Sequence, residues 1–171
     1  MYPPPDLQAL KARNRSKVSA TYASVSVFDT RSFDLQYKES RAFITPAIEP
    51  ELHPYIAKIL RKLKSPCLAV NGTADHIHIL FALGRVVTVA ELLEEVKTNS
   101  SKWIKTKSRE FKNFHWQRGY GAFSIGQSNV EILKRYISNQ KEHHRRVTFQ
   151  DEYREFLESY GIDFDERYMW D

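Results

Sequence analysis

Two histidines stand one residue apart in an extended, mostly apolar run, Ala74-Asp75-His76-Ile77-His78-Ile79-Leu80-Phe81. A strand has a side-chain period of two, so His76 and His78 project from one face while Ile77 and Ile79 project from the other. Two neighbouring imidazoles on a rigid strand form half of a metal site. A solvated strand face that happens to carry two histidines explains this pair equally well, because short metal motifs have many false matches.

A second set of polar side chains lies further along the chain, in a helix predicted over residues 128–146. At 3.6 residues per turn, Tyr136 and Gln140 are about 40° apart around the axis and one turn apart along it. Both border the apolar stripe of this helix, so they can reach a site while the helix stays packed. Taken singly, Tyr136 could be a half-buried ring and Gln140 a surface amide. His143 and His144 could simply favour the helix C-terminus through the macrodipole.

Together these residues suggest phosphoryl chemistry. A divalent ion held by His76, His78 and Gln140 would keep open positions for phosphate oxygens and act as a Lewis acid. Tyr136 would attack the phosphorus, form a covalent phosphotyrosine and release a hydroxyl end. Rejoining would need no ATP, which agrees with the lack of a Gly-rich phosphate loop in the sequence. Nitrogen ligands favour Mn²⁺, whereas cellular abundance favours Mg²⁺.

Apolar periodicity and turn signals predict the elements that position these residues. Strands are expected at 18–28, 67–70, 74–81 and 119–126, and helices at 52–63, 88–104, 128–146 and 149–160. Capping boxes at Thr88-x-x-Glu91 and Ser128-x-x-Glu131 mark two helix starts, and Pro54 is expected in the first turn of its helix. The order predicts an α+β fold: a ferredoxin-like (RRM-like) antiparallel sheet with helices on one face, plus an added C-terminal tyrosine-bearing helix and tail.

Length and composition indicate one soluble domain of 171 residues, with 42% hydrophobic and 27% charged residues. We expect a flexible basic arm at 1–17, the core at 18–126, and the tyrosine helix with a C-terminal extension at 128–171. One cysteine, Cys67, allows no internal disulfide, and no run is long enough to span a membrane, which favours the cytoplasm and no membrane partner. The net charge of +5 favours an anionic partner, with nucleic acid first.

Basic residues interleaved with aromatic ones suit single-stranded nucleic acid, because charge follows the backbone while rings stack on bases. A solvated helix end next to core tryptophans is the structural alternative, and we expect Trp103 in the core. The candidate nucleic-acid contacts are Lys97, Lys102, Lys105, Lys107, Arg109, Lys112, Trp116 and Arg118, with Arg13 and Arg15 from the N-terminal arm.

Six short motifs occur in order: DHIHIL at 75–80, KTNSSKW at 97–103, WQRGYGAFSIG at 116–126, YISNQKEHH at 136–144, TFQDEY at 148–153 and DERYMW at 165–170. By these motifs the chain resembles single-tyrosine transposases of the HUH (His-hydrophobe-His) superfamily, over residues 67–170. The group is the IS200-like one, which includes REP-associated tyrosine transposases. Many short motifs at consistent spacing are more specific than any one of them.

The resemblance implies a metal-dependent transposase that cleaves and rejoins single-stranded DNA at hairpins near element ends. By the motif match, His76, His78 and Gln140 take the metal and Tyr136 is the nucleophile. Family members act as homodimers, in which the tyrosine helix often faces the histidines of the other subunit, so the site can form in trans. A protein of this kind is cytoplasmic and associated with the nucleoid.

The first strand departs from the family pattern, because Ser24 to Arg31 contains no histidine and none precedes His53. This departure puts the DNA contacts of that strand in question. Two other functions fit parts of the sequence: a non-catalytic ferredoxin-like module that binds DNA or RNA hairpins, and a rolling-circle-type nickase. A pure binder has no need of the histidines and tyrosine together, and a nickase usually has a larger chain.

Overall fold

Four strands form the centre of the molecule, which we describe from a computed structural model covering residues 24–30, 44–116 and 120–165. They are β1 (Ser24–Thr30), β2 (Cys67–Gly72), β3 (His76–Ala82) and β4 (Gly121–Ile125). The sheet has the order β2-β3-β1-β4, and every pair of neighbours is antiparallel. The predicted α+β class with a small antiparallel sheet is therefore confirmed. β1 extends two residues beyond the predicted end at Phe28, and residues 18–23 of the predicted strand lie outside the described residues.

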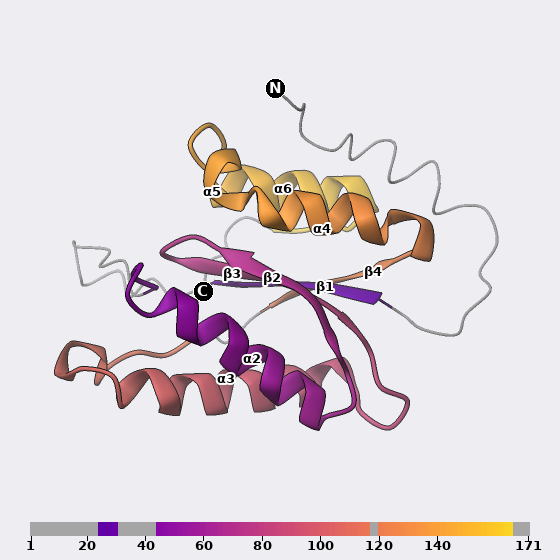
Figure 1. The fold of residues 1–171 in the computed structure, drawn as a ribbon. Coiled ribbons are helices and arrows are strands. Elements are labelled where there is room, and N and C mark those ends of the chain that lie inside the picture. The colour runs from indigo at the N-terminus through magenta and orange to yellow at the C-terminus, as the bar shows by residue number, and fades with distance from the viewer. Residues whose placement is uncertain (1–23, 31–43, 117–119, 166–171) are drawn as a thin grey trace.

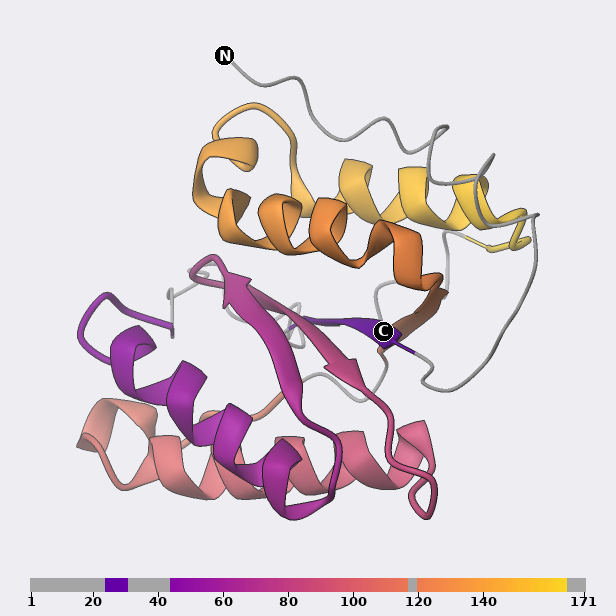
Figure 2. The same ribbon diagram turned by 45° about the vertical axis from the view of Figure 1, so that its right-hand side comes forward.

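Helices cover both faces of this sheet (Figures 1 and 2). α2 and α3 lie against one face, and α4, α5 and α6 lie against the other. The bounds are α2 Glu49–Lys62, α3 Val89–Lys105, α4 Val130–Ser138, α5 Gln140–His143 and α6 Phe149–Tyr160, with short 3₁₀ turns at Arg109–Phe111 and Gln127–Asn129. The added C-terminal helices thus close the face that the α2 and α3 pair leaves open.

β3 divides the interior into two apolar clusters, as its period-two pattern predicts. Ile77, Ile79 and Phe81 pack with α2 and α3 in one cluster. Leu80 packs with α4 and α6 in the other. Since alternate residues of a strand share a face, the two histidines of β3 project with Leu80 toward the C-terminal helices.

Capping and proline signals in the sequence predict where α2 and α3 begin, and the prediction for α2 requires a correction. α3 begins at the predicted capping box: the Thr88 side chain accepts from the backbone N–H of Glu91, whose carboxylate accepts from the backbone of Thr88. α2 begins three residues earlier than the predicted Leu52, so Pro54 lies inside the helix rather than in its first turn. Pro50 occupies the first turn instead, where its missing N–H costs nothing.

The helix predicted over 128–146 is interrupted, which corrects the expectation of one continuous helix. α4 starts after Asn129 without a side-chain cap, so Ser128 opens no capping box. The helix ends at Ser138, and a second short helix, α5, begins after Asn139. The side-chain amide of Asn71 on β2 donates to the carbonyls of Ile137 at 2.8 Å and Ser138 at 3.1 Å. These carbonyls therefore have partners outside the helix, which explains how the break is tolerated.

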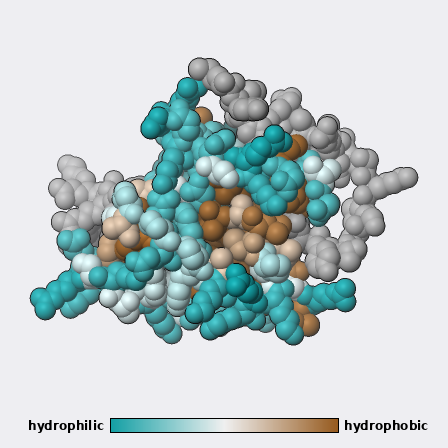
Figure 3. Space-filling view, viewed as in Figure 1, coloured by the Kyte–Doolittle hydropathy of each residue, from teal (hydrophilic) through white to brown (hydrophobic). Residues whose placement is uncertain are grey.

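The face seen in Figure 3 carries apolar side chains near its middle, at the level of the sheet, between hydrophilic side chains of the two helical layers. β2 forms this edge of the sheet, and its residues Cys67 to Asn71 are partly exposed. Of the helices that the description includes, none combines the length and apolarity needed to cross a bilayer.

The turn that introduces β3 depends on a glycine. A Cβ atom at Gly72 would lie 2.8 Å from the Cα of Ile77 and still closer to the carbonyl oxygen of His76. Both contacts are with backbone of the histidine strand, so a side chain here must displace that strand. We expect Gly72→Ala to lower the free energy of unfolding by about 2 kcal/mol or more in urea denaturation.

Gly161→Ala is the matched control for this substitution. Gly161 has φ of +64°, and nothing lies within 4 Å of its would-be Cβ, so only the left-handed backbone penalty of about 1 kcal/mol applies. Equal losses for the two substitutions would contradict a specific role of Gly72 in seating β3.

Candidate active site

The side chains of His76 and His78 project from β3 into the interior, beneath the C-terminal helices. Both side chains are buried, at 1% and 0% exposure. The Nδ1 atom of His76 lies 2.8 Å from a carboxylate oxygen of Asp75 and 2.8 Å from the hydroxyl of Thr73. This hydrogen bond lowers the pKa of Asp75 well below its usual range. Because Nδ1 is engaged at the turn, Nε2 is the nitrogen of His76 that remains for the interior.

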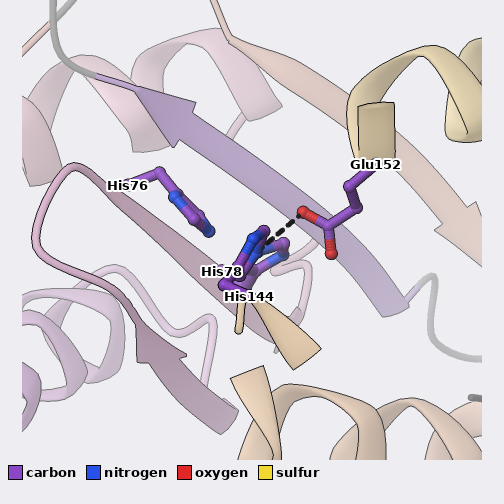
Figure 4. A group of neighbouring side chains, drawn as sticks. All are labelled: His76, His78, His144 and Glu152. Atoms are coloured by element: carbon purple, nitrogen blue, oxygen red, sulfur yellow. Dashed lines mark ion pairs between the residues drawn. The ribbon is translucent and has the colours of Figure 1, made fainter. Parts of the chain in front are cut away.

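His144 and Glu152 join the strand histidines from the opposite side. His144 follows α5, and its Nδ1 lies 2.9 Å from the carbonyl oxygen of Val147. Its Nε2 lies 3.3 Å from Oε2 of Glu152, and the Nε2 of His78 lies 3.4 Å from the same oxygen. Figure 4 shows the rings of His78 and His144 beside the carboxylate, which α6 supplies, while the ring of His76 lies on the far side of these two rings. Three imidazoles and one carboxylate therefore converge on a single point.

Tyr136 and Gln140 contact the other oxygen of the same carboxylate. The hydroxyl of Tyr136 donates a hydrogen bond to Oε1 of Glu152, and it lies 3.4 Å from Nε2 of His143. The amide of Gln140 donates to Oε1 of Glu152 at 3.2 Å. Tyr136 is 5% exposed and Gln140 is fully buried. The break at Asn139 thus leaves both residues directed at one site, although they belong to different helices.

Burial and the shared carboxylate set the protonation states of the cluster. Burial lowers the pKa of His78 to about 4, so this ring is neutral at physiological pH. Burial alone would raise the pKa of Glu152, but hydrogen bonds with His144 and His78 outweigh it and lower that pKa below its usual range. Burial alone would lower the pKa of His144, but the neighbouring carboxylate of Glu152 and the carbonyl of Val147 together raise it above its usual value. Burial and the charge of Glu152 raise the pKa of Tyr136, which keeps the phenol protonated.

The donor set fits a divalent metal ion. One ligand atom from each of His76, His78, His144 and Glu152 lies within 4.8 Å of all the others. Buried polar atoms without a hydrogen-bond partner are rare, yet Nε2 of His76 and Oε1 of Gln140 have none here. Imidazole nitrogens with a carboxylate are ordinary ligands of transition-metal dications. This buried cluster can therefore hold a metal ion.

The sequence predicted one part of the site and missed another. His76, His78, Tyr136 and Gln140 are brought together, as the geometric hypothesis required. His144 and Glu152 were not predicted as members. A signal for Glu152 was available, because it lies on the apolar face of α6, three residues after Phe149 and four before Phe156. A carboxylate at such a position requires partners in the interior.

The predicted nucleic-acid residues are not part of this cluster. Lys102, Lys105, Arg109 and Lys112 are exposed along α3 and the segment after it, which lies on the other face of the sheet. Lys97 lies over the ring of Tyr120, and Lys107 pairs with Glu51 and lies over Trp103. Trp103 packs partly buried against the core and stacks on Tyr55.

Trp116 requires a correction. Its ring is 7% exposed, and its indole N–H donates to the hydroxyl of Ser100 at 2.8 Å. A ring in this position stabilises the core and is not available to stack on bases. Arg13, Arg15 and Arg118 lie outside the residues that the structure describes.

The sequence matches the family described as Transposase IS200 like over residues 35–140. This segment contains the two strand histidines, Tyr136 and Gln140, whereas His144 and Glu152 lie beyond its end. No curated protein matches the chain.

Two solved structures resemble this one in fold. A candidate transposase from Deinococcus radiodurans R1 has a TM-score of 0.52 at 12% identity, and the alignment covers 74% of this chain and 97% of that one. A REP-associated tyrosine transposase bound to a REP hairpin has a TM-score of 0.54 at 15% identity, with 77% of this chain and 76% of that one covered. At these identities the likeness concerns the fold.

The neutral, buried state of His78 predicts that acid destabilises the metal-free protein. The ordinary pKa of histidine is 6.5, whereas burial lowers that of His78 to about 4, so between these pH values the unfolded chain binds the extra proton. The free energy of unfolding should therefore fall as the pH drops from 6.5 to 4, by up to about 3 kcal/mol from this group. His78→Asn should reduce this pH dependence in urea denaturation with a chelator present. An unchanged slope in the variant would show that His78 is not buried as a neutral ring.

Proposed function

This chain belongs to the IS200-like transposase family, and from that premise we propose that it is a metal-dependent enzyme acting on single-stranded DNA. It cleaves and rejoins the strand through a covalent bond to Tyr136. Family membership implies a DNA-processing enzyme, and the buried histidine cluster is consistent with the metal site of the HUH superfamily. The identity of the nucleophile, the ligands and the DNA structure are parts of the proposal.

The observation that carries the proposal is that a tyrosine hydroxyl and the strand histidines meet within one chain. The rings of Tyr136 and His78 have centroids 6.2 Å apart, and both side chains contact the carboxylate of Glu152. This arrangement supports an active site formed in cis. A homodimer remains part of the proposal, but the tyrosine of one subunit need not reach the histidines of the other.

In the proposed reaction the phenol oxygen of Tyr136 attacks the phosphorus of a DNA phosphodiester. The new bond joins this oxygen to phosphorus, and the bond from phosphorus to one sugar oxygen breaks. The released hydroxyl end takes up a proton, and the phenol gives one up. Attack by a hydroxyl end in the reverse direction rejoins the strand and frees Tyr136. The ester conserves the bond energy, so no ATP is consumed.

The proposed metal ligands are Nε2 of His76 and His78 together with Oε1 of Gln140. When bound, a divalent ion such as Mn²⁺ or Mg²⁺ supplies the positive charge that polarises the scissile phosphate. The chain contributes orientation, because Asp75 and Thr73 fix the His76 ring through Nδ1. Oε1 of Gln140 is buried without a hydrogen-bond partner, which supports its role as a ligand.

We assign the core to the ferredoxin-like class on its topology. The strand order β2-β3-β1-β4, with α2 between β1 and β2 and α3 between β3 and β4, is the split βαβ arrangement. The open face of such a sheet usually remains available to partners. In this chain α4, α5 and α6 occupy that face and carry Tyr136 and Gln140 to the histidines.

The proposed substrate is single-stranded DNA with hairpin ends. The relative in complex with a REP hairpin supports this choice, as does the exposed basic series Lys102, Lys105, Arg109 and Lys112. Exposed cations of this kind contact the phosphate backbone without reading its sequence. Because they lie on the α3 side of the sheet, they would contact DNA outside the reaction site rather than at the scissile phosphate.

The test is the formation of a covalent adduct. In the presence of Mn²⁺, wild-type protein should convert a single-stranded oligonucleotide with an element-end hairpin into a protein–DNA species stable on a denaturing gel. Tyr136→Phe should abolish this species, a loss of at least about 1,000-fold, while hairpin binding in gel-shift assays persists. His76→Ala should reduce it strongly.

Tyr160→Phe is the matched control, since Tyr160 lies in α6 at 36% exposure and packs against Phe123 with the two rings tilted. This variant should form the adduct at the wild-type rate. Hairpin binding without any adduct, across element-end substrates and both metals, would favour the non-catalytic binding module instead.

A further inference from the structure

Glu152 occupies a central position that the proposed function does not explain. It is 1% exposed, comes from α6, and lies outside the segment matched by the family. Its two oxygens face different groups: Oε2 faces the imidazoles of His78 and His144, and Oε1 accepts from Tyr136 and Gln140. One carboxylate thus contacts both the histidine cluster and the candidate nucleophile.

We propose that His144 and Glu152 are metal ligands in addition to the strand histidines, and that Glu152 contacts both the metal and the hydroxyl of Tyr136. Oε2 of Glu152 binds the ion beside Nε2 of His76, His78 and His144. Oε1 holds the hydroxyl of Tyr136 next to it. The ligand assignment stands on its own, whereas the role of Oε1 toward a nucleophile rests on the proposed function of Tyr136.

The spacing of the ligand atoms supports this assignment. Strong hydrogen bonds between a charged imidazole and a carboxylate are about 2.7–2.9 Å long, but Oε2 of Glu152 lies 3.4 Å from His78 and 3.3 Å from His144. These two separations are longer than that of a strong ion pair, and one ligand atom from each of His76, His78, His144 and Glu152 lies within 4.8 Å of the others. The four side chains are therefore close enough to share one ion, and Glu152 is not held in a short ion pair with either ring.

The imidazoles are also oriented as ligands. The Nδ1 atom of His144 lies within hydrogen-bonding distance of the Val147 carbonyl, and that of His76 is engaged by Asp75 and Thr73. Such partners fix the tautomer that leaves the Nε2 lone pair free for a metal. Nε2 of His76 is buried and has no hydrogen-bond partner. The rings of His76 and His144 are therefore held through Nδ1, which leaves Nε2 of each as the nitrogen available to the cluster.

The composition of the set favours a transition metal. Three imidazoles and one carboxylate suit Mn²⁺ or Zn²⁺. Mg²⁺ prefers oxygen ligands in octahedral geometry and usually keeps several waters. A buried site with three nitrogen ligands should therefore select Mn²⁺ over Mg²⁺, which narrows the pair of metals that the sequence suggests.

The experiment measures Mn²⁺ binding to the full chain without DNA, from the loss of the free-Mn²⁺ signal in electron paramagnetic resonance. Glu152→Gln keeps the size of the side chain, and His144→Asn removes the imidazole. Each should weaken Mn²⁺ binding by at least about 10-fold. Glu158→Gln is the matched control in the same helix, where Glu158 is exposed, and should bind as wild type does. Tyr136→Phe should also retain wild-type affinity.

Several results would overturn the ligand assignment. One is wild-type Mn²⁺ affinity in folded Glu152→Gln, verified by circular dichroism, which would leave Glu152 as an ion-pair partner of the neighbouring histidines and not a ligand. Another is the absence of Mn²⁺ binding by the wild-type chain. Displacement of Mn²⁺ by an equal concentration of Mg²⁺ would refute the proposed metal preference.

A second measurement tests the role of Oε1 and separates this inference from the proposed function. At saturating Mn²⁺, Glu152→Gln should form the covalent DNA adduct at least about 10-fold more slowly than Glu158→Gln. An equal rate would overturn the tyrosine-holding role alone. If no variant and no wild-type protein formed an adduct while Glu152→Gln still lost Mn²⁺, the proposed function would fail and the ligand assignment would stand.

Discussion

The alternation of side chains along β3 is the constraint on which the rest of the structure depends. Ile77 and Ile79 anchor the strand against α2 and α3, and the same geometry turns His76 and His78 toward α4, α5 and α6. Buried imidazoles cost free energy unless they have polar partners. The helices over this face therefore carry polar groups at positions that would otherwise be apolar, and two of these groups, the amide of Gln140 and the carboxylate of Glu152, are almost completely buried.

The contacts that pack the C-terminal helices also position the polar side chains of this cluster. The side-chain amide of Asn71 on β2 donates hydrogen bonds to the carbonyls of Ile137 and Ser138, which allows the helix to break at Asn139. That break sends Gln140 into a second short helix, whose following turn brings His144 back toward the sheet. A continuous helix through this region would move His144 away from β3 along the axis. The apolar cluster around Phe156 and Leu157 in turn fixes α6 over the site.

The sequence allowed much of this arrangement to be predicted, for physical reasons that vary with the residue. The strand histidines follow from local alternation, and the start of α3 follows from Thr88 and Glu91, because both signals act within a few residues. The apolar face of α6 marks Glu152 as a buried residue, but which groups its carboxylate meets depends on how α6 packs on the sheet, and periodicity along one helix does not reveal that. The break at Asn139 depends on Asn71, a residue distant in the chain. Trp116 was predicted to stack on bases because it is an aromatic residue among basic ones. Its indole N–H instead donates a hydrogen bond to the hydroxyl of Ser100 in the interior.

The central claim is that the tyrosine and histidines of one chain form one working site. Mixing two inactive variants tests it directly: Tyr136→Phe, which keeps the histidines, and His78→Ala, which keeps the tyrosine, are allowed to exchange subunits and are then given a hairpin oligonucleotide and Mn²⁺. Intact-mass spectrometry of the products reports any covalent adduct on either chain. A site formed in cis predicts no adduct from the mixture at any ratio. An adduct on the His78→Ala chain, appearing only after mixing, would show that Tyr136 acts with the histidines of another subunit and would contradict this account.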